Sequence, residues 1–195
     1  MEIQEGRIKF RFADDQNPIK FDDTPLYSKF KDGIPEGKGV DFITISENKL
    51  VFIEVKDFRG SETEITPRQR IICGLRKGTE KGGNKVEEDS LDIEVSQKIA
   101  HTFACLYGAN TFPEFTDKAD VLKPYFPSDS NGPIEIILFL EGDFGSITRP
   151  KKIIMQLIQD AIRKRMDNWI YTPKVRVVDS KSCPERIFQV TLLEH

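Results

Sequence analysis

The stretch from residue 39 to residue 56 constrains the fold of this chain more than any other part of the sequence. Two runs within it, Val40–Ile45 and Leu50–Val55, are apolar and rich in β-branched and aromatic residues. A short polar segment around Glu47 and Asn48 separates them. Two such runs on either side of a few turn-forming residues predict a pair of antiparallel strands joined by a tight turn.

Charged residues lie at the open end of this predicted hairpin. With the turn centred between Glu47 and Asn48, Asp41 lies opposite Glu54, and the alternation of side chains places both on one face of the sheet. Lys56 shares that face because it lies two residues beyond Glu54. Opposed residues have Cβ atoms about 5 Å apart, so two opposed carboxylates repel each other and require a cation. A divalent metal with a lysine beside it meets that requirement, whereas a one-residue bulge would separate the carboxylates and exclude the site.

The spacing of these residues resembles a known motif. Asp41 is followed, after a gap of twelve residues, by Glu54-Val55-Lys56, which is similar to the D…ExK core of the PD-(D/E)XK nuclease superfamily. The longer segment 40–60 also resembles a bacterial family of hypothetical proteins with a strand pair of this kind. The superfamily resemblance implies an α/β, restriction-endonuclease-like fold, in which helices flank a mixed β-sheet. Val40 stands where the superfamily usually has a proline.

A helix is predicted over residues 91–107, because apolar residues cover most of its circumference. The polar residues that remain form one stripe at three- and four-residue spacing, made of Glu94, Gln97, Lys98 and His101. A helix that is apolar nearly all round is buried, so its polar stripe faces either solvent or a polar site. In the superfamily the helix after ExK can offer a glutamine or lysine to the active site, and Gln97 and Lys98 occupy the matching region.

The resemblance implies a metal-dependent nuclease that hydrolyses phosphodiester bonds of nucleic acid, with DNA favoured over RNA as the substrate. Asp41, Glu54 and the carbonyl of Val55 would bind Mg²⁺ or Mn²⁺, ions that prefer oxygen ligands. The metal would lower the pKa of a bound water and offset charge on the phosphate. Lys56 would position the attacking water or stabilise the pentavalent phosphate, and Gln97 completes the expected catalytic set. A homodimer is a further expectation, because nucleases that cut both strands often dimerise.

Two other classes of protein fit the same residues. One keeps the nuclease-like fold and the acidic pair without catalysis, and binds nucleic acid or a protein partner. The other is a structural or dimerising protein, whose carboxylates form salt bridges with Lys56 and Arg59. A lack of metal binding favours the first class, and a large exposed apolar patch without a cleft around Asp41 favours the second.

The rest of the chain interleaves strands and helices, which indicates a single mixed α/β domain over residues 1–195. A continuous apolar run at Ile134–Leu140 is typical of a buried central strand. Thr148 is predicted to cap the helix that follows. The core-facing residues of that helix are predicted to be Ile154, Leu157, Ile158, Ala161, Ile162 and Trp169. Further strands are predicted at 7–12, 19–21, 174–178 and 187–193, helical turns at 25–30 and 66–75, and irregular segments at 78–89 and 110–131.

Charge and cysteine content exclude several classes of protein. The 195 residues include 29 basic and 32 acidic ones, a net charge of −3, which argues against a protein that coats nucleic acid. Cys73, Cys105 and Cys183 are odd in number and widely spaced, so reduced thiols in a cytoplasm are predicted rather than disulfides or a zinc site. No apolar run is long enough to span a membrane, and the N-terminal segment does not resemble a signal peptide. The last residues, 193–195, resemble the start of an affinity tag.

Overall fold

The predicted hairpin is present in the computed structural model of the chain, which describes residues 1–60, 65–109 and 133–194. The strands are β1 (Glu2–Glu5), β2 (Ile8–Phe12), β3 (Ile19–Lys20), β4 (Phe42–Ser46), β5 (Lys49–Asp57), β6 (Glu80–Lys81), β7 (Asn84–Lys85), β8 (Ile134–Glu141), β9 (Lys174–Val178) and β10 (Phe188–Leu192). The helices are η1 (Phe21–Asp23), α1 (Pro25–Gly33), α2 (Ile65–Arg70), α3 (Leu91–Ala109) and α4 (Lys151–Met166).

The strands form a five-stranded mixed sheet and a three-stranded antiparallel sheet, together with the small β6–β7 hairpin. The five-stranded sheet has the order β3-β4-β5-β8-β9, in which β5, β8 and β9 are parallel and β4 is antiparallel to β5. The three-stranded sheet has the order β1-β2-β10. The expectation of a mixed sheet flanked by helices is therefore confirmed.

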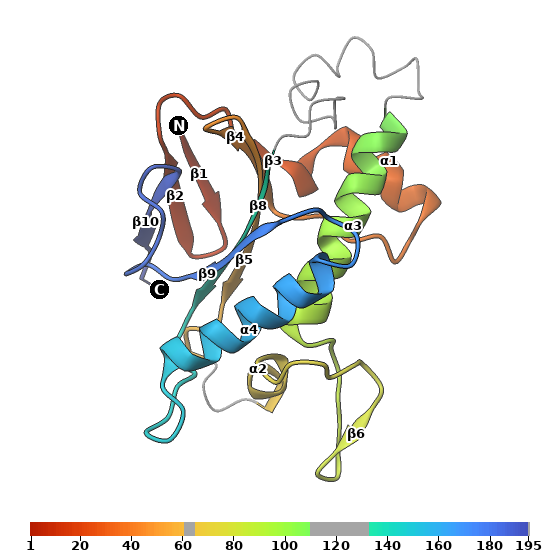
Figure 1. The fold of residues 1–195 in the computed structure, drawn as a ribbon, viewed down its shortest axis with the longest axis vertical. Helices are drawn as coiled ribbons and strands as arrows, with labels where there is room; N and C mark the ends of the chain where they lie inside the picture. Colours follow the sequence, from red (N-terminus) through yellow and green to blue (C-terminus); the bar gives the residue numbers. More distant parts are fainter. Residues whose placement is uncertain (61–64, 110–132, 195) are drawn as a thin grey trace.

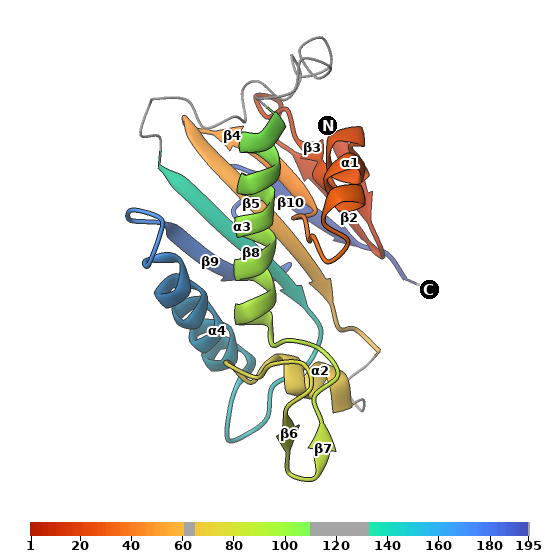
Figure 2. The same ribbon diagram turned by 90° about the vertical axis from the view of Figure 1, so that its right-hand side faces the viewer.

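Three layers stack across the molecule (Figure 1). The five-stranded sheet lies in the middle, the three-stranded sheet packs on one face, and α3 and α4 cover the other. Figure 2 shows α3 lying across the five-stranded sheet and α4 alongside it, next to β9. Strands β5 and β8 are thus buried on both faces, which explains the continuous apolar sequence of β8.

The turn between β4 and β5 has the conformation that the sequence predicts. Glu47 and Asn48 have φ angles of 50° and 60°, the left-handed region that two-residue hairpin turns require. Ile43 pairs with Phe52, and the register runs without a bulge from Phe42 to Ser46. The predicted register is confirmed.

Alternation along this hairpin divides its side chains between two cores. Ile43 and Phe52 pack in the core beneath the helices, whereas Phe42 and Ile53 pack against the three-stranded sheet. Glu54 lies two residues beyond Phe52 and therefore points to the helix side of the sheet. The acidic end of the hairpin is consequently covered by α3.

The segment 78–89 differs from its prediction as an irregular loop. It contains the exposed β6–β7 hairpin, which is closed by a 2.8 Å hydrogen bond from the N–H of Val86 to the carbonyl of Thr79. The side chain of Val86 is fully buried and anchors the hairpin to the domain. Helix α2 ends at Arg70, earlier than predicted. The segment 110–131, which is predicted to be irregular, lies wholly outside the described residues.

Helix α4 also differs in detail from its prediction. It begins at Lys151 without a side-chain cap, so the capping role predicted for Thr148 is wrong. Leu157 is 48% exposed and Trp169 is 47% exposed, because the buried stripe of the helix follows four-residue spacing through Ile154, Ile158, Ile162 and Met166. Trp169 lies beyond the helix and packs its ring edge-on against Phe103.

In the described part of the chain, no helix is both long and apolar enough to cross a membrane.

Acidic residues at the carboxyl ends of β8 and β9 make stability sensitive to acid. Burial alone would raise the pKa of Glu141, but hydrogen bonds from Ser180 and Gly142 and the charge of Lys151 outweigh it and lower the pKa. Burial alone would also raise the pKa of Asp179, but hydrogen bonds from Ser182 and Lys151 outweigh burial and lower the pKa. A carboxylate with a lowered pKa stabilises the fold above its unfolded pKa of about 4, and this contribution is lost as the pH falls through the folded value.

Lys151→Met is therefore expected to lower the free energy of unfolding at pH 7. It is also expected to make the variant lose less of that free energy than the wild type when the pH falls. The Lys151 ammonium lies 3.2 Å from Glu141 and 3.1 Å from Asp179, and its removal weakens the cause of both shifts. Urea unfolding between pH 7 and pH 3 measures the effect, with Lys152→Met at the exposed neighbouring position as the control. Identical pH profiles in the wild type and Lys151→Met would contradict the assignment.

Candidate functional site

Asp41 and Glu54 come together on the helix side of the five-stranded sheet, near the carboxyl ends of its parallel strands. Asp41 directly precedes β4 and is 7% exposed, and Glu54 lies within β5 and is 1% exposed. The backbone N–H of Val55 donates a 2.6 Å hydrogen bond to Oδ2 of Asp41, which fixes that carboxylate against β5. The N–H and C=O of one strand residue point to the same side of the strand, so the Val55 carbonyl is directed toward Asp41 as well.

Two lysine ammonium groups approach Glu54. Lys98, on α3, places its Nζ 2.7 Å from Oε2 of Glu54 and 3.4 Å from Oδ1 of Asp41. Lys56 places its Nζ 3.0 Å from Oε1 of Glu54. Lys98 Nζ is also only 2.6 Å from this oxygen, but neither ammonium is aligned for a hydrogen bond to it. Oε1 of Glu54 is thus a buried carboxylate oxygen with ionic contacts and no hydrogen bond among the described residues.

The polar stripe of α3 faces this site rather than open solvent. Oε1 of Glu94 lies 3.1 Å from Lys56 Nζ, and Oε2 contacts Arg70 of α2. Oε1 of Gln97 accepts a 3.3 Å hydrogen bond from the ammonium of Lys38. His101 accepts the backbone N–H of Lys38 at Nδ1, over 3.0 Å, so this ring nitrogen carries no proton. The sequence left open whether this stripe faces solvent or a polar site, and these contacts show that it faces a polar site.

Burial and charge shift the ionisation of the central groups. Burial raises the pKa of Asp41, although Lys98 and the N–H of Val55 oppose it. Burial and the adjacent Asp41 carboxylate raise the pKa of Glu54. Burial alone would lower the pKa of Lys98, but the two carboxylates outweigh it and raise the pKa. The Asp41–Glu54 pair therefore favours a bound positive charge, as opposed carboxylates in a low-dielectric site must.

An open cleft lies next to this site and shares Lys98 and Glu94 with it. It has a volume of about 460 Å³ and lies between α3 and the segment that connects α1 to β4. Lys98 and Glu94 line its α3 side, and Lys31 and Lys38 lie on the opposite wall with Asp22 of η1. Acidic residues and lysines both line the cleft, so a ligand that entered it would contact Lys98, which also contacts the two carboxylates.

The residues present fit a hard divalent cation. Asp41 and Glu54 supply two carboxylates, Val55 supplies a carbonyl, and Oε1 of Glu54 has an unused hydrogen-bonding position. Mg²⁺ is commonly held by one or two carboxylates and keeps several waters, so this donor set is sufficient. Across residues 1–60, 65–109 and 133–194, no three His, Cys, Asp or Glu side chains form a group that could hold a metal by themselves. The carbonyl and water ligands are therefore essential to the fit.

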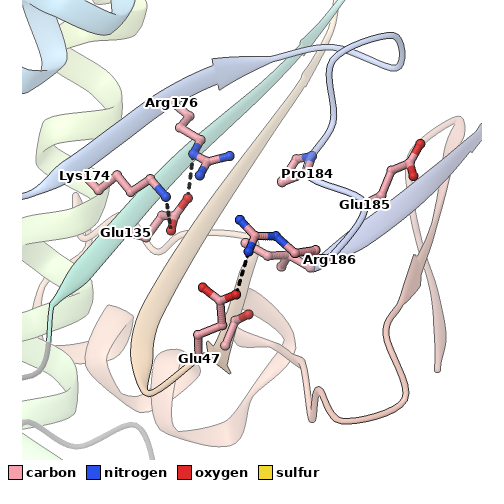
Figure 3. A pocket seen from close by; sticks show the side chains of 9 residues that line it. Glu47, Glu135, Lys174, Arg176, Pro184, Glu185 and Arg186 are labelled. Atoms are coloured by element: carbon pink, nitrogen blue, oxygen red, sulfur yellow. Dashed lines mark hydrogen bonds and ion pairs between the residues drawn. The ribbon is translucent and has the colours of Figure 1, made fainter.

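A second hollow lies at the opposite end of the hairpin, on the face that carries the three-stranded sheet (Figure 3). Glu135 is 2% exposed, and its carboxylate lies 2.8 Å from Arg176 Nε and 3.2 Å from Lys174 Nζ. At the rim, Arg186 pairs with Glu47 at 2.9 Å. The hollow has a volume of about 110 Å³, and three acidic and three basic residues line it. The hollow is thus smaller than the cleft and does not concentrate charge of one sign.

Sequence comparison assigns the chain to a family. The model of a family of unknown function, DUF6661, matches residues 24–192. The chain belongs to this family. The matched DUF6661 region includes the hairpin, α3 and both walls of the cleft except for Asp22. No curated protein and no solved structure matches the chain.

Three residues of the candidate site carry little sequence signal. Asp22, Lys38 and Arg70 lie in the short helices and the loop that precede or follow the hairpin, where charged residues are common. Lys38 and Gln97 are brought together across 59 positions of sequence, and only the packing of α3 shows that they meet. Gly37 and Gly39 flank Lys38, and a Cβ at Gly39 would lie 2.8 Å from the Tyr27 ring, so this segment approaches α1 closely.

Proposed function

We propose that this DUF6661 chain is a metal-dependent nuclease with a restriction-endonuclease-like fold, acting on DNA rather than RNA. The observation that carries the proposal is the meeting of Asp41, Glu54 and the Val55 carbonyl beside Lys56, next to a cleft that Lys98 lines. The arrangement of helix, hairpin, helix and strand in the order α1, β4–β5, α3, β8 is consistent with that of the PD-(D/E)XK superfamily. A homodimer that cuts both strands is part of the same proposal.

Each residue of the chain has a defined role in this proposal. Asp41, Glu54 and the carbonyl of Val55 hold Mg²⁺ or Mn²⁺, which when bound lowers the pKa of a coordinated water and offsets charge on the scissile phosphate. Lys56 directs its ammonium to the attacked phosphate and orients the water. Gln97 holds Lys38 at the rim of the cleft, where the lysine can contact a neighbouring phosphate.

A second candidate function is a nuclease-like module that binds nucleic acid or a protein without cutting. The contacts of Lys98 and Lys56 with Glu54 favour it, because they neutralise the acidic pair without a metal. Arg59 contributes little to a salt-bridge network at the site, since its guanidinium lies 2.8 Å from Asp57. The two candidates differ in one measurable property, which is metal-dependent cleavage.

Cleavage of labelled DNA and RNA in Mg²⁺ or Mn²⁺, with a chelator control, tests the proposal. Lys56→Met is expected to lower the rate of DNA cleavage by about 10²-fold, as the loss of one preorganised charge at a reacting phosphate does. Gln97→Ala is expected to lower it only several-fold, because Gln97 acts through Lys38. Wild-type protein that binds DNA but shows no cleavage with either metal would instead establish the binding module.

A further inference from the structure

We propose that Lys98 occupies the metal position in the metal-free protein, and that it moves to Asp22 in the cleft when the metal binds. The proposal rests on the proposed function and deepens it. Lys98 Nζ lies between the two expected ligands, 2.7 Å from Glu54 and 3.4 Å from Asp41. Only 14% of its side chain is exposed. An ammonium and a divalent cation cannot occupy this position together.

The charges around the site are balanced without a metal. Within the buried part of the site, three carboxylates, those of Asp41, Glu54 and Glu94, face three cations, those of Lys56, Lys98 and Arg70. The further partner of Arg70, Glu88, is exposed to solvent. A divalent cation added to this set leaves an excess of two positive charges in a largely buried environment. Repulsion of this kind is strong where water is excluded, so one of the cations must leave.

Lys98 is the cation whose departure the contacts favour. Lys56 keeps a second partner, Glu94, at 3.1 Å when it loses Glu54. Lys98 contacts Asp41 and Glu54 alone among the described residues, and both are expected metal ligands. Its side chain also lines the open cleft, so it can swing outward on its flexible stem without a change in α3.

Asp22 provides the destination for the displaced ammonium. It lines the same cleft as Lys98, and its Oδ1 is buried with no hydrogen-bond partner in the described part of the chain. Burial raises the pKa of Asp22, and the positive charges of Lys20 and, to a smaller extent, Lys98 oppose that effect, which places Asp22 and Lys98 within electrostatic range. In this outer position Lys98 would also be able to contact a phosphate that enters the cleft.

Calorimetric titration with Mn²⁺ tests the displacement. Lys98→Met is expected to bind Mn²⁺ at least about tenfold more tightly than the wild type, because no ammonium has to leave the site. Asp22→Asn is expected to bind it more weakly, because the displaced ammonium loses its acceptor. Lys31→Met, which removes an exposed lysine from the opposite wall of the same cleft, is the control and should match the wild type. Lys98→Gln serves as the second variant if the methionine variant does not fold.

Thermal unfolding gives an independent readout. Without metal, Lys98→Met is expected to melt at a lower temperature than the wild type, and Mn²⁺ should raise its melting temperature more. Equal or weaker Mn²⁺ binding by Lys98→Met, with wild-type binding that Asp41→Asn removes, would overturn the displacement while the proposed function stands. Absence of binding in both the wild type and Lys98→Met would overturn the metal site itself, and the displacement with it.

Discussion

Glu54→Gln is expected to reduce metal-dependent cleavage by about 10³-fold, because a bound metal contributes several kcal/mol to stabilisation of the transition state. The amide has nearly the shape of the carboxylate, so it fits a position that is only 1% exposed. It carries no charge to offset that of the metal. The remaining cations keep partners, since Lys98 still faces Asp41 and Lys56 still faces Glu94. The fold is therefore expected to persist while cleavage is lost.

Glu135→Gln is the matched control for this experiment. Glu135 is also a buried carboxylate on a central strand and also contacts two cations, but it lies on the other face of the sheet. Its amide variant is expected to cleave at the wild-type rate. Steady-state rates with a labelled DNA substrate, together with circular dichroism of each variant, separate loss of chemistry from loss of fold. A rate for Glu54→Gln within tenfold of the wild type would exclude Glu54 as a metal ligand.

Phe10→Ala is expected to lower the free energy of unfolding by about 3–5 kcal/mol, the usual cost of truncating a buried aromatic side chain. Phe10 is fully buried on β2, and its ring centroid lies 5.3 Å from those of Phe42, Phe139 and Phe188. Phe42 and Phe139 belong to the five-stranded sheet, so Phe10 joins the two sheets. Because Phe42 directly follows Asp41, this packing also supports the position of the candidate site.

Urea unfolding measures the effect of Phe10→Ala. Tyr171→Ala, at a position that is 93% exposed, is the control and is expected to change stability by less than about 0.5 kcal/mol. A loss of less than about 1 kcal/mol for Phe10→Ala would show that the three-stranded sheet does not share a core with the rest of the domain.

The hairpin could be predicted from sequence because its signals are local. Apolar runs of strand length and a turn at Glu47 and Asn48 fix the register, and the register alone sets which side chains share a face. The pairing of Ile43 with Phe52 confirms it. The placement of Glu54 on the helix side then follows from the alternation of side chains. Strand β1 and the β6–β7 hairpin could not be predicted, since they are polar and exposed and depend on long-range pairing or a single buried residue.

The candidate site could be predicted only in part. The polar stripe of α3 shows that some of its residues face a polar region, but neighbouring positions such as Gln97 and Lys98 differ by about 100° around the helix axis. Which of the two reaches the carboxylates depends on how α3 is rotated against the sheet. The structure places Lys98 on Glu54 and directs Gln97 to Lys38. Packing, rather than the pattern of the helix, decides between them.

The most direct test of the central claim is the binding of Mn²⁺ to the wild type and to Asp41→Asn, measured by calorimetry at neutral pH. The wild type is expected to bind Mn²⁺ with a heat signal that Asp41→Asn abolishes, because the amide removes one of two charged ligands while the hairpin is retained. Binding of equal strength in both proteins would contradict the assignment of Asp41 and Glu54 as a metal site.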